Sequence, residues 1–401
     1  MRDCTILHDI LENQCSSIHK KRLASLMVAT QSLLDGQQLS LTELGRNIRG
    51  KVSAKHNIKR IDRLLGNASL YRERMTIYRW HAKLLCQSLP RPIILVDWAD
   101  VREQTRYMTL RASLSFQGRS VILYERVFPF CQYNSPKSHS AFLQELASIV
   151  PASCRPIVVT DAGYRNPWFR EVQSLGWHYV GRIRGEVRFR VHGQSEWVLN
   201  KTYYCQANHT PTYLGEGQLG RKSPIDAHLY LYKAKPRGRK DRRSVKAHNQ
   251  HHKEKSYRTG SKEPWLLCTN LPAHVTGAKD IVRFYAKRMQ IEESFRDMKS
   301  TQYGLGLRHS NSRCVKRYDI FMLLILLAEW VLRLIGIAAH KRDWQRDFQA
   351  NTIRHRPVLS LIRLGREVRK RSQQYVIKPS EIRQALQDYL DSIQFTGDAK
   401  L

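Results

Sequence analysis

Apolar residues recur at helical spacing in the first 70 residues of the chain. One such set would share a single helix face and consists of Leu23, Leu26, Met27, Leu33 and Leu34. Asp35-Gly36 is typical of the end of that helix, and Ser40-Leu41-Thr42-Glu43 has the pattern of a capping box that opens another. These patterns predict a helical region over residues 1–75.

A basic helix closes this region. Its apolar stripe, Ile58, Ile61 and Leu65, ends at Gly66. Basic residues crowd its polar sides and the turn before it: Arg46, Arg49, Lys51, Lys55, Lys59, Arg60 and Arg63. The pattern favours a helical DNA-binding unit, although an ordinary small helical bundle with a solvated basic face has the same pattern.

From Pro92 on, short apolar runs typical of strands appear. The predicted strands span 93–96, 108–116, 120–128, 156–160 and 179–183, with a turn at 117–119, and the predicted helices span 139–150 and 168–175. Strands followed by alternating helices and strands indicate an α/β fold with a mixed sheet. We place this domain at residues 76–340.

Residues 186–275 interrupt that rhythm with polar, tyrosine-rich and weakly β-patterned sequence. We interpret them as a β-rich insertion in the sheet domain. The basic tract 233–262 inside it contains His248, His251 and His252, but it has no cysteines at zinc-ligand spacing. A loop that faces DNA is the better interpretation.

The most apolar segment of the chain is 320–339. Glu329 and Arg333 lie inside it and would be costly in a membrane, so a buried core helix is favoured over a membrane span. Beyond Arg342 the sequence is again helical in pattern and basic, as in residues 358–370.

The chain carries 68 Lys and Arg against 34 Asp and Glu, a formal net charge of +34. Such a charge predicts a polyanionic partner, and its spread along the whole chain favours nucleic acid over an anionic membrane. The eight cysteines show no CxxC or zinc-like pairing, and the N-terminus carries acids rather than an apolar signal. We therefore expect a cytoplasmic, DNA-associated protein with reduced thiols and no membrane partner.

Two aspartates stand at the ends of apolar runs, Asp97 in ILVDW and Asp161 in IVVTDAG. Carboxylates at strand ends reach a cleft at the sheet edge, where two of them can share a metal ion. Either aspartate alone could instead cap a strand or start a turn, and Asp100 is a close competitor to Asp97.

A third acid follows on a predicted helix. Tyr285, Arg288, Glu292 and Lys299 fall within roughly 60° of one another at about 100° per residue, so we expect one helix face to present all four. An adjoining apolar stripe that would dock the helix consists of Phe284, Ile291, Phe295 and Met298. Glu293 points away, which makes Glu292 the better metal ligand; the alternative is a salt-bridged helix surface.

The spacing Tyr-x2-Arg-x3-Glu-x6-Lys resembles the YREK signature of bacterial cut-and-paste insertion-sequence transposases of the DDE class. The resemblance extends over nearly the whole chain and is closest to Tn-Ten-type transposases. It implies an RNase H-like domain interrupted by a β insertion, and C-terminal helices, residues 341–401, that pair subunits in a homodimer on double-stranded DNA.

The resemblance also implies chemistry. Asp97, Asp161 and Glu292 would hold two Mg²⁺ ions, with Mn²⁺ as a substitute, while Tyr285, Arg288 and Lys299 would grip phosphate oxygens. The same carboxylates would nick the element end, form and open a hairpin, and join the element to target DNA. Trp265 would stack on a flipped base, or else be a core residue at a strand start.

Two rival functions share much of this pattern. An RNase H-like nuclease would use the same carboxylates and metals to hydrolyse without joining. A catalytically inactive DNA-binding regulator would keep the charge and the helical N-terminus. ATP-driven and dinucleotide chemistries lose support because neither GxxxxGK[ST] nor GxGxxG occurs.

Overall fold

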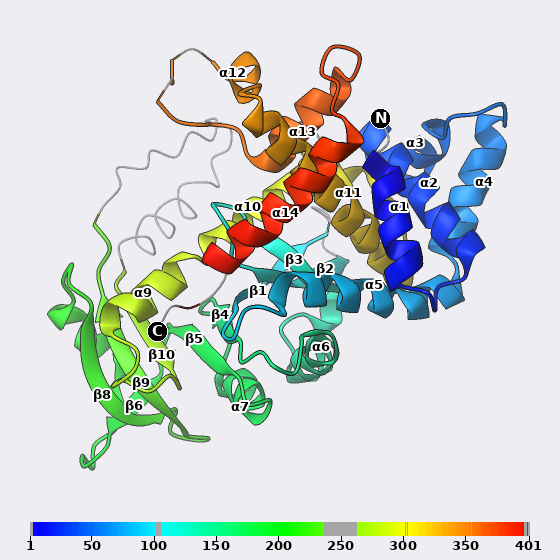
Figure 1. The fold of residues 1–401 in the computed structure, drawn as a ribbon. Coiled ribbons are helices and arrows are strands. Elements are labelled where there is room, and N and C mark those ends of the chain that lie inside the picture. The colour runs from blue at the N-terminus through cyan, green and yellow to red at the C-terminus, as the bar shows by residue number, and fades with distance from the viewer. Residues whose placement is uncertain are drawn as a thin grey trace, which may run out of the picture. The chain divides into compact units, whose positions relative to one another are not determined.

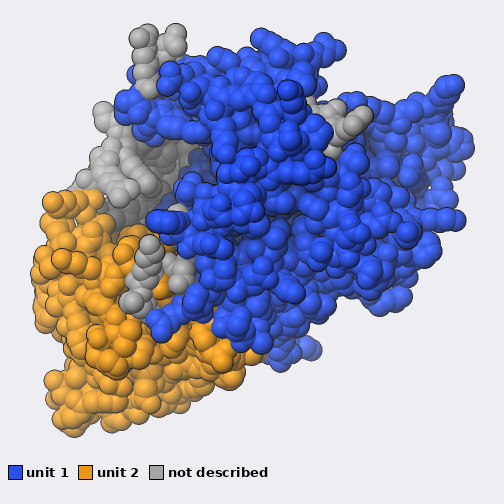
Figure 2. All heavy atoms as spheres, in the orientation of Figure 1, with its two compact units in different colours: residues 1–154, 289–398 blue, residues 155–288, 399–401 orange. Residues whose placement is uncertain are grey.

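The computed structural model describes residues 3–101, 106–235, 263–300, 302, 304–350, 352–353, 355–396 and 399 of the 401-residue chain. Two compact units divide the chain: unit 1 comprises residues 1–154 and 289–398, and unit 2 comprises residues 155–288 and 399–401 (Figures 1 and 2). The domain boundaries expected after residues 75 and 340 stay predictions. Most of the basic tract 233–262 lies outside the described residues.

The N-terminal part of unit 1 is helical, as predicted. Its helices are α1 (Asp3–Gln14), α2 (Lys20–Gly36), α3 (Leu41–Arg46), α4 (Ala54–Leu65) and α5 (Ala68–Cys86). The apolar set on α2 is buried, and the helix ends at Gly36. The Ser40 hydroxyl caps α3 by accepting a hydrogen bond from the Glu43 backbone N–H at 3.3 Å, which confirms the first half of the predicted capping box.

Three antiparallel strands follow in unit 1, in the order β3-β2-β1. They are β1 (Ile93–Asp100), β2 (Tyr107–Leu114) and β3 (Val121–Pro129), followed by the 3-10 helix η1 (Phe130–Gln132) and by α6 (Pro136–Ile149). Gly118 adopts φ +71° in the predicted turn between β2 and β3, a conformation that favours glycine.

The rest of unit 1 comes from the C-terminal part of the chain. Its elements are α10 (Met289–Lys299), η3 (Leu307–His309), α11 (Val315–Lys341), α12 (Gln345–Phe348), α13 (Leu361–Lys370) and α14 (Pro379–Thr396). By length and composition α11 could cross a membrane, but 94% of its apolar window is buried inside the protein. Its two acids, Asp319 and Glu329, are buried as well. The prediction of a core helix is confirmed.

Unit 2 contains a mixed sheet with the strand order β4-β5-β10-β9-β8-β6-β7. Its elements are β4 (Ile157–Thr160), α7 (Asn166–Ser174), β5 (His178–Ile183), β6 (Arg188–Val191), β7 (Val198–Leu199), η2 (Asn200–Gln206), β8 (Thr212–Leu219), β9 (Ile225–Tyr232), β10 (Trp265–Thr269) and α9 (Ala278–Ala286). β4 and β5 are parallel, and the other pairs are antiparallel.

The predicted fold class is confirmed: strands and helices form an α/β protein with a mixed sheet, flanked by helical N-terminal and C-terminal regions. The segment predicted as an insertion is β-rich. Its strands do not form a separate sheet. β10 pairs with β5 on one side and with β9 on the other, so the inserted strands extend the sheet that contains β4 and β5.

Candidate active site

Asp97 is the fifth of the eight residues of β1 and follows four fully buried residues, Ile93, Ile94, Leu95 and Val96. The strand continues to Asp100, so the expectation that it ends at Asp97 is wrong. Its side chain is half-buried, and one carboxylate oxygen accepts a hydrogen bond from the Trp98 backbone N–H at 2.8 Å. The strand thus fixes the position of the carboxylate while leaving it partly accessible.

A row of charged residues shows which face of the strands Asp97 occupies. Asp97 pairs with Arg111 on β2, and Arg111 pairs with Glu125 on β3, so the three side chains lie on one face. Arg111 also contacts Phe295 and Met298 of α10, with its guanidinium carbon 4.6 Å from the Phe295 ring centroid. Asp97 therefore points to the face that α10 covers.

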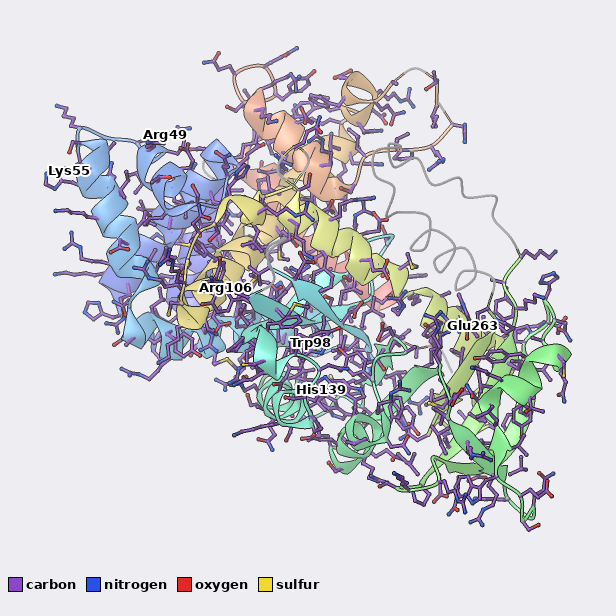
Figure 3. The ribbon with its side chains drawn as sticks, turned by 180° about the vertical axis from the view of Figure 1, so that it is seen from behind. Arg49, Lys55, Trp98, Arg106, His139 and Glu263 are labelled. Atoms are coloured by element: carbon purple, nitrogen blue, oxygen red, sulfur yellow. The ribbon has the colours of Figure 1, made fainter. Side chains whose placement is uncertain are left out.

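Trp98 anchors the opposite face of β1. Its indole N–H donates to Nε2 of His139 on α6 at 3.1 Å, and its ring packs against Phe128 and Tyr133 (Figure 3). Burial lowers the pKa of His139 to about 4, so the imidazole is neutral at pH 7 and can accept this bond. These contacts hold the backbone next to Asp97.

On α10 the two adjacent glutamates have different environments. Ile291, Phe295 and Met298 are buried, as the predicted apolar stripe requires. Glu292 is exposed, whereas Glu293 is half-buried and forms an ion pair with Arg119 at 3.3 Å. Glu292 thus presents the more accessible carboxylate of the two.

Lys299, at the end of α10, forms a close ion pair with Asp100: Nζ and Oδ1 are 2.6 Å apart. The lysine side chain is 13% exposed, and burial lowers its pKa although Asp100 stabilises its charge. The carboxylate of Asp100, the alternative to Asp97 in the sequence, is thus engaged in an ion pair with a lysine.

In unit 2, Asp161 directly follows the buried strand β4. Its Oδ1 accepts a hydrogen bond from the Gly163 backbone N–H at 2.8 Å, which forms an Asx-type turn. A Cβ atom at position 163 would lie 3.0 Å from the same oxygen, so glycine allows the turn to close tightly. The turn sets the direction of the carboxylate.

A basic pocket adjoins Asp161. Its lining residues are Asp161, Ala162, Gly163, Arg165, Arg184, Gly185, Lys201 and Glu263. Cations outnumber carboxylates there, which suits an anionic ligand beside Asp161. The sequence analysis did not single out Arg165, Arg184 or Lys201. Arg184 could have been found, because it directly follows the strand β5 and so lies at the sheet edge.

Tyr285, on α9, is buried next to Trp265, and their ring centroids are 4.9 Å apart. Trp265 starts β10, is half-buried, and also packs against Tyr232 with centroids 5.6 Å apart. Burial raises the pKa of Tyr285, while Arg288 and Arg182 lower it and Asp161 raises it. Trp265 and Tyr285 thus pack together in unit 2, and the charges of Arg288 and Asp161 both act on the tyrosine hydroxyl.

Glu263 organises the arginines at the end of β5. Its carboxylate pairs with Arg184 at 2.7 Å and with Arg182 at 3.4 Å, and it accepts a hydrogen bond from the Tyr204 hydroxyl at 3.3 Å. The charge of Arg182 in turn lowers the pKa of Tyr285. Neither Glu263 nor Arg182 was singled out from the sequence, since each stands alone in its local pattern.

The prediction of one helix across 285–299 is wrong. α9 ends at Ala286 and α10 begins at Met289. Between them the N–H groups of Lys287 and Arg288 bond three residues back, to Phe284 and Tyr285, which tightens the last turn of α9. Apolar spacing does not reveal such a change of hydrogen-bond pattern.

The predicted site residues divide between the units. Asp97, Glu292 and Lys299 belong to unit 1, and Asp161, Trp265, Tyr285 and Arg288 belong to unit 2. Carboxylate oxygens such as those of Asp97, Asp161 and Glu292 fit Mg²⁺, which prefers oxygen ligands. Within the part of the chain that the structure describes, no three His, Cys, Asp or Glu side chains form a ready metal site.

Residues 88–328 match the model of the transposase DDE domain family, a span of more than half of the chain. The chain belongs to this family. No curated protein matches the chain. The matched span includes Asp97, Asp161 and Glu292.

Membership of the transposase DDE domain family makes the protein a transposase in the general sense, a DNA-binding enzyme of a group that uses divalent metal ions. The resemblance noted in the sequence is confirmed at this level.

Proposed function

We propose that the protein excises and integrates a DNA element by metal-dependent phosphodiester cleavage and strand transfer, with Asp97, Asp161 and Glu292 as its catalytic carboxylates. One observation carries the proposal. Within the family segment, Asp97 and Asp161 each follow a buried strand run, and Glu292 is exposed on the helix that covers the Asp97 face.

The three carboxylates would hold two Mg²⁺ ions, for which Mn²⁺ would substitute. When bound, such ions stabilise the attacking and departing oxygens of an in-line displacement at phosphorus. The cations of unit 2, Arg165, Arg184 and Lys201, would orient DNA phosphates next to Asp161.

Tyr285, Arg288 and Lys299 would complete a YREK group that grips the phosphate, as in the Tn-Ten-type transposases. The mechanism implied by that resemblance passes through a DNA hairpin. Support comes from the burial of Tyr285 beside Trp265 and from the charge of Arg288 near the tyrosine hydroxyl. Lys299 reaches the Asp97 strand through its ion pair with Asp100.

Other regions would serve DNA binding and assembly. α4 exposes Lys55 (Figure 3) together with Lys59, Arg60 and Arg63, which supports the assignment of residues 1–75 to DNA contact. Residues 341–401 would pair subunits in a homodimer. The protein would act in the bacterial cytoplasm.

The decisive experiment compares Asp97→Asn, Asp161→Asn and Glu292→Gln with the wild type on DNA that carries paired candidate ends, in the presence of Mg²⁺. We expect each variant to lose cleavage while its DNA affinity stays within a few-fold of wild type, because each loses a metal ligand rather than a phosphate contact. Gel analysis of nicked, hairpin, excised and joined DNA gives the readout.

Glu293→Gln is the matched control, since it removes the neighbouring acid on the same helix and should retain cleavage. Cleavage by any one of the three carboxylate variants would remove that residue from the site. Wild-type products that are cut but never joined would favour the nuclease, and uncut DNA bound by the wild type would favour the inactive regulator.

A further inference from the structure

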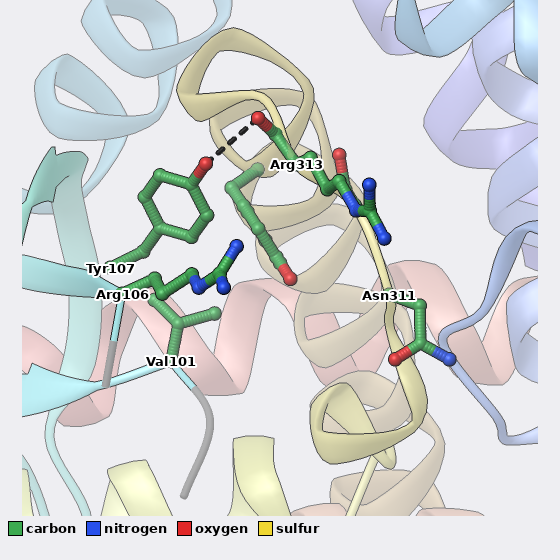
Figure 4. Close-up of a pocket in the computed structure, with 7 residues that line it drawn as sticks. Val101, Arg106, Tyr107, Asn311 and Arg313 are labelled. Carbon is green, nitrogen blue, oxygen red and sulfur yellow. Dashed lines mark hydrogen bonds between the residues drawn. The ribbon is translucent and has the colours of Figure 1, made fainter. Parts of the chain in front are cut away.

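A second polar pocket lies in unit 1, at the end of the β1–β2 hairpin (Figure 4). It is lined by Val101, Arg106, Tyr107, Asn311, Ser312, Arg313 and Tyr318. None of these residues belongs to the proposed catalytic group. The lining joins the start of β2 to the segment that precedes α11.

Hydrogen bonds and ring contacts fix the walls of this pocket. The Tyr107 hydroxyl donates to the Arg313 carbonyl oxygen at 2.7 Å, which ties the segment before α11 to β2. The rings of Tyr107 and Tyr318 pack with centroids 5.3 Å apart, and Tyr318 is fully buried. The Val101 N–H donates to the Tyr107 carbonyl at 3.1 Å and closes the hairpin. Backbone and side-chain contacts between β2 and the segment before α11 therefore hold the walls of the pocket in place.

The described residues that line the pocket carry positive charge. Arg106 and Arg313 are exposed, and no carboxylate is among the lining residues. Over the described ranges of the chain, neither guanidinium forms an ion pair. By contrast, Arg317, one helical turn further on, pairs with Asp62. The amide of Asn311 and the hydroxyl of Ser312 add neutral hydrogen-bonding groups.

We propose that this pocket binds a phosphate of the DNA backbone, held by Arg106 and Arg313 together with Asn311. Guanidinium groups match phosphate oxygens in geometry and charge. The start of α11 beside Arg313 adds a partial positive charge of helix N–H groups. The ligand follows from the family's action on DNA. Only the distance of the bound phosphate from the cut rests on the proposed function, through the role of Asp97.

The position relative to Asp97 indicates which phosphate is bound. Val101 lies four residues after Asp97 along extended backbone, which corresponds to roughly 13 Å at about 3.3 Å per residue. Successive nucleotides of one strand advance by about 3.4 Å along the duplex axis. The pocket would therefore hold the duplex a few nucleotides from the bond that is cut, as a positioning contact and not a catalytic one.

The test measures the affinity of the full-length protein for a short DNA duplex as salt is varied, for wild type, Arg106→Ala, Arg313→Ala and the double variant. If the arginines clamp one phosphate, the slope of log affinity against log salt should become shallower by about 0.9 in the double variant. Binding at low salt should weaken about tenfold or more.

Two controls make the result specific. Arg383→Ala removes an exposed arginine of α14 that lies outside the pocket, and we expect the wild-type slope. The double lysine variant, Arg106→Lys with Arg313→Lys, keeps the charge and should keep the slope while losing part of the affinity. Comparing the lysine and alanine variants shows whether a change in slope comes from the loss of positive charge or from the loss of the arginine side chains themselves.

A double alanine variant with the wild-type slope and affinity would overturn the proposal, and so would an equal change in the Arg383 control. Glu292→Gln, measured in parallel, should bind with the wild-type slope. The binding experiment measures affinity and not cleavage. Its result for this pocket can therefore be interpreted even if the cleavage experiment contradicts the proposed catalytic carboxylates.

Discussion

At the scale of single residues, Trp265 combines packing contacts with partial exposure. The indole contacts Tyr232 and Tyr285 and is still half-buried rather than enclosed. A rigid, partly accessible aromatic ring at this position suits stacking on an unpaired base.

We predict that Trp265→Ala spares the first nick and slows hairpin formation by roughly ten- to a hundredfold, because base–aromatic stacking contributes about 1–3 kcal/mol. Trp265→Phe should rescue in part, as should DNA that lacks the flipped base. Single-turnover gels measure both steps. An unfolded Trp265→Ala protein, or an unchanged hairpin yield, would support a purely structural role.

A second residue-scale prediction concerns Glu329 on α11. Burial raises its pKa to about 7, although Arg111 and Arg333 lower it, and Asp297 and Glu125 raise it further. Its pKa in the unfolded chain is about 4.3. Between about pH 4.3 and pH 7 the folded protein therefore holds a proton on Glu329 that the unfolded chain has lost. The contribution of this protonated carboxyl to the free energy of unfolding is complete below about pH 4 and is lost as the pH rises through 7.

Glu329→Gln should therefore be more stable than the wild type at pH 8, by up to roughly 3 kcal/mol, with a smaller difference at pH 5. Urea unfolding at both pH values checks this. A difference that grows toward low pH would show that the carboxylate is ionised and stabilised in the folded protein.

At the scale of elements, the contact between α11 and α13 depends on two glycines. A Cβ atom at Gly336 would come within 2.1 Å of the Leu361 carbonyl oxygen, and one at Gly365 within 2.1 Å of the Leu332 carbonyl oxygen. The two helix backbones therefore touch. α13 is further tied to α2, since Arg366 donates to the Gln37 side chain at 2.9 Å.

We predict that Gly365→Ala destabilises the protein by about 1–3 kcal/mol or more, because the helices must separate to admit the methyl group. Gly66→Ala is the control: its Cβ would have no neighbour closer than 3.5 Å, and we expect a much smaller change. Urea unfolding curves give both values. Equal stability of Gly365→Ala and wild type would mean that the helix contact is looser than described.

At the scale of the whole molecule, the net charge of +34 predicts that phosphate contacts contribute much of the affinity for DNA. If many lysines and arginines contact phosphates, DNA affinity should fall steeply with salt, with a log–log slope of about −0.9 per neutralised phosphate. Fluorescence anisotropy between 50 and 200 mM salt measures the slope. A flat response would contradict binding by phosphate contacts.

Much of the protein could be predicted from the sequence because its signals are local. Apolar spacing located α2, α4 and the start of β1 to within a few residues, and Ser40 was identified as a cap from four consecutive residues. The burial of α11 followed from Glu329 and Arg333 within it, since charges in a long apolar helix are costly in a membrane.

Only the tertiary structure decided the partners of individual charges. In the sequence Asp100 is a close competitor to Asp97; the structure shows that Asp100 forms an ion pair with Lys299, 199 positions away. The break between α9 and α10 likewise depends on hydrogen bonds that apolar spacing does not encode. Glu263 binds Arg182 and Arg184 across about 80 residues. Such pairings are set by chain folding, because electrostatic partners need proximity in space rather than in sequence.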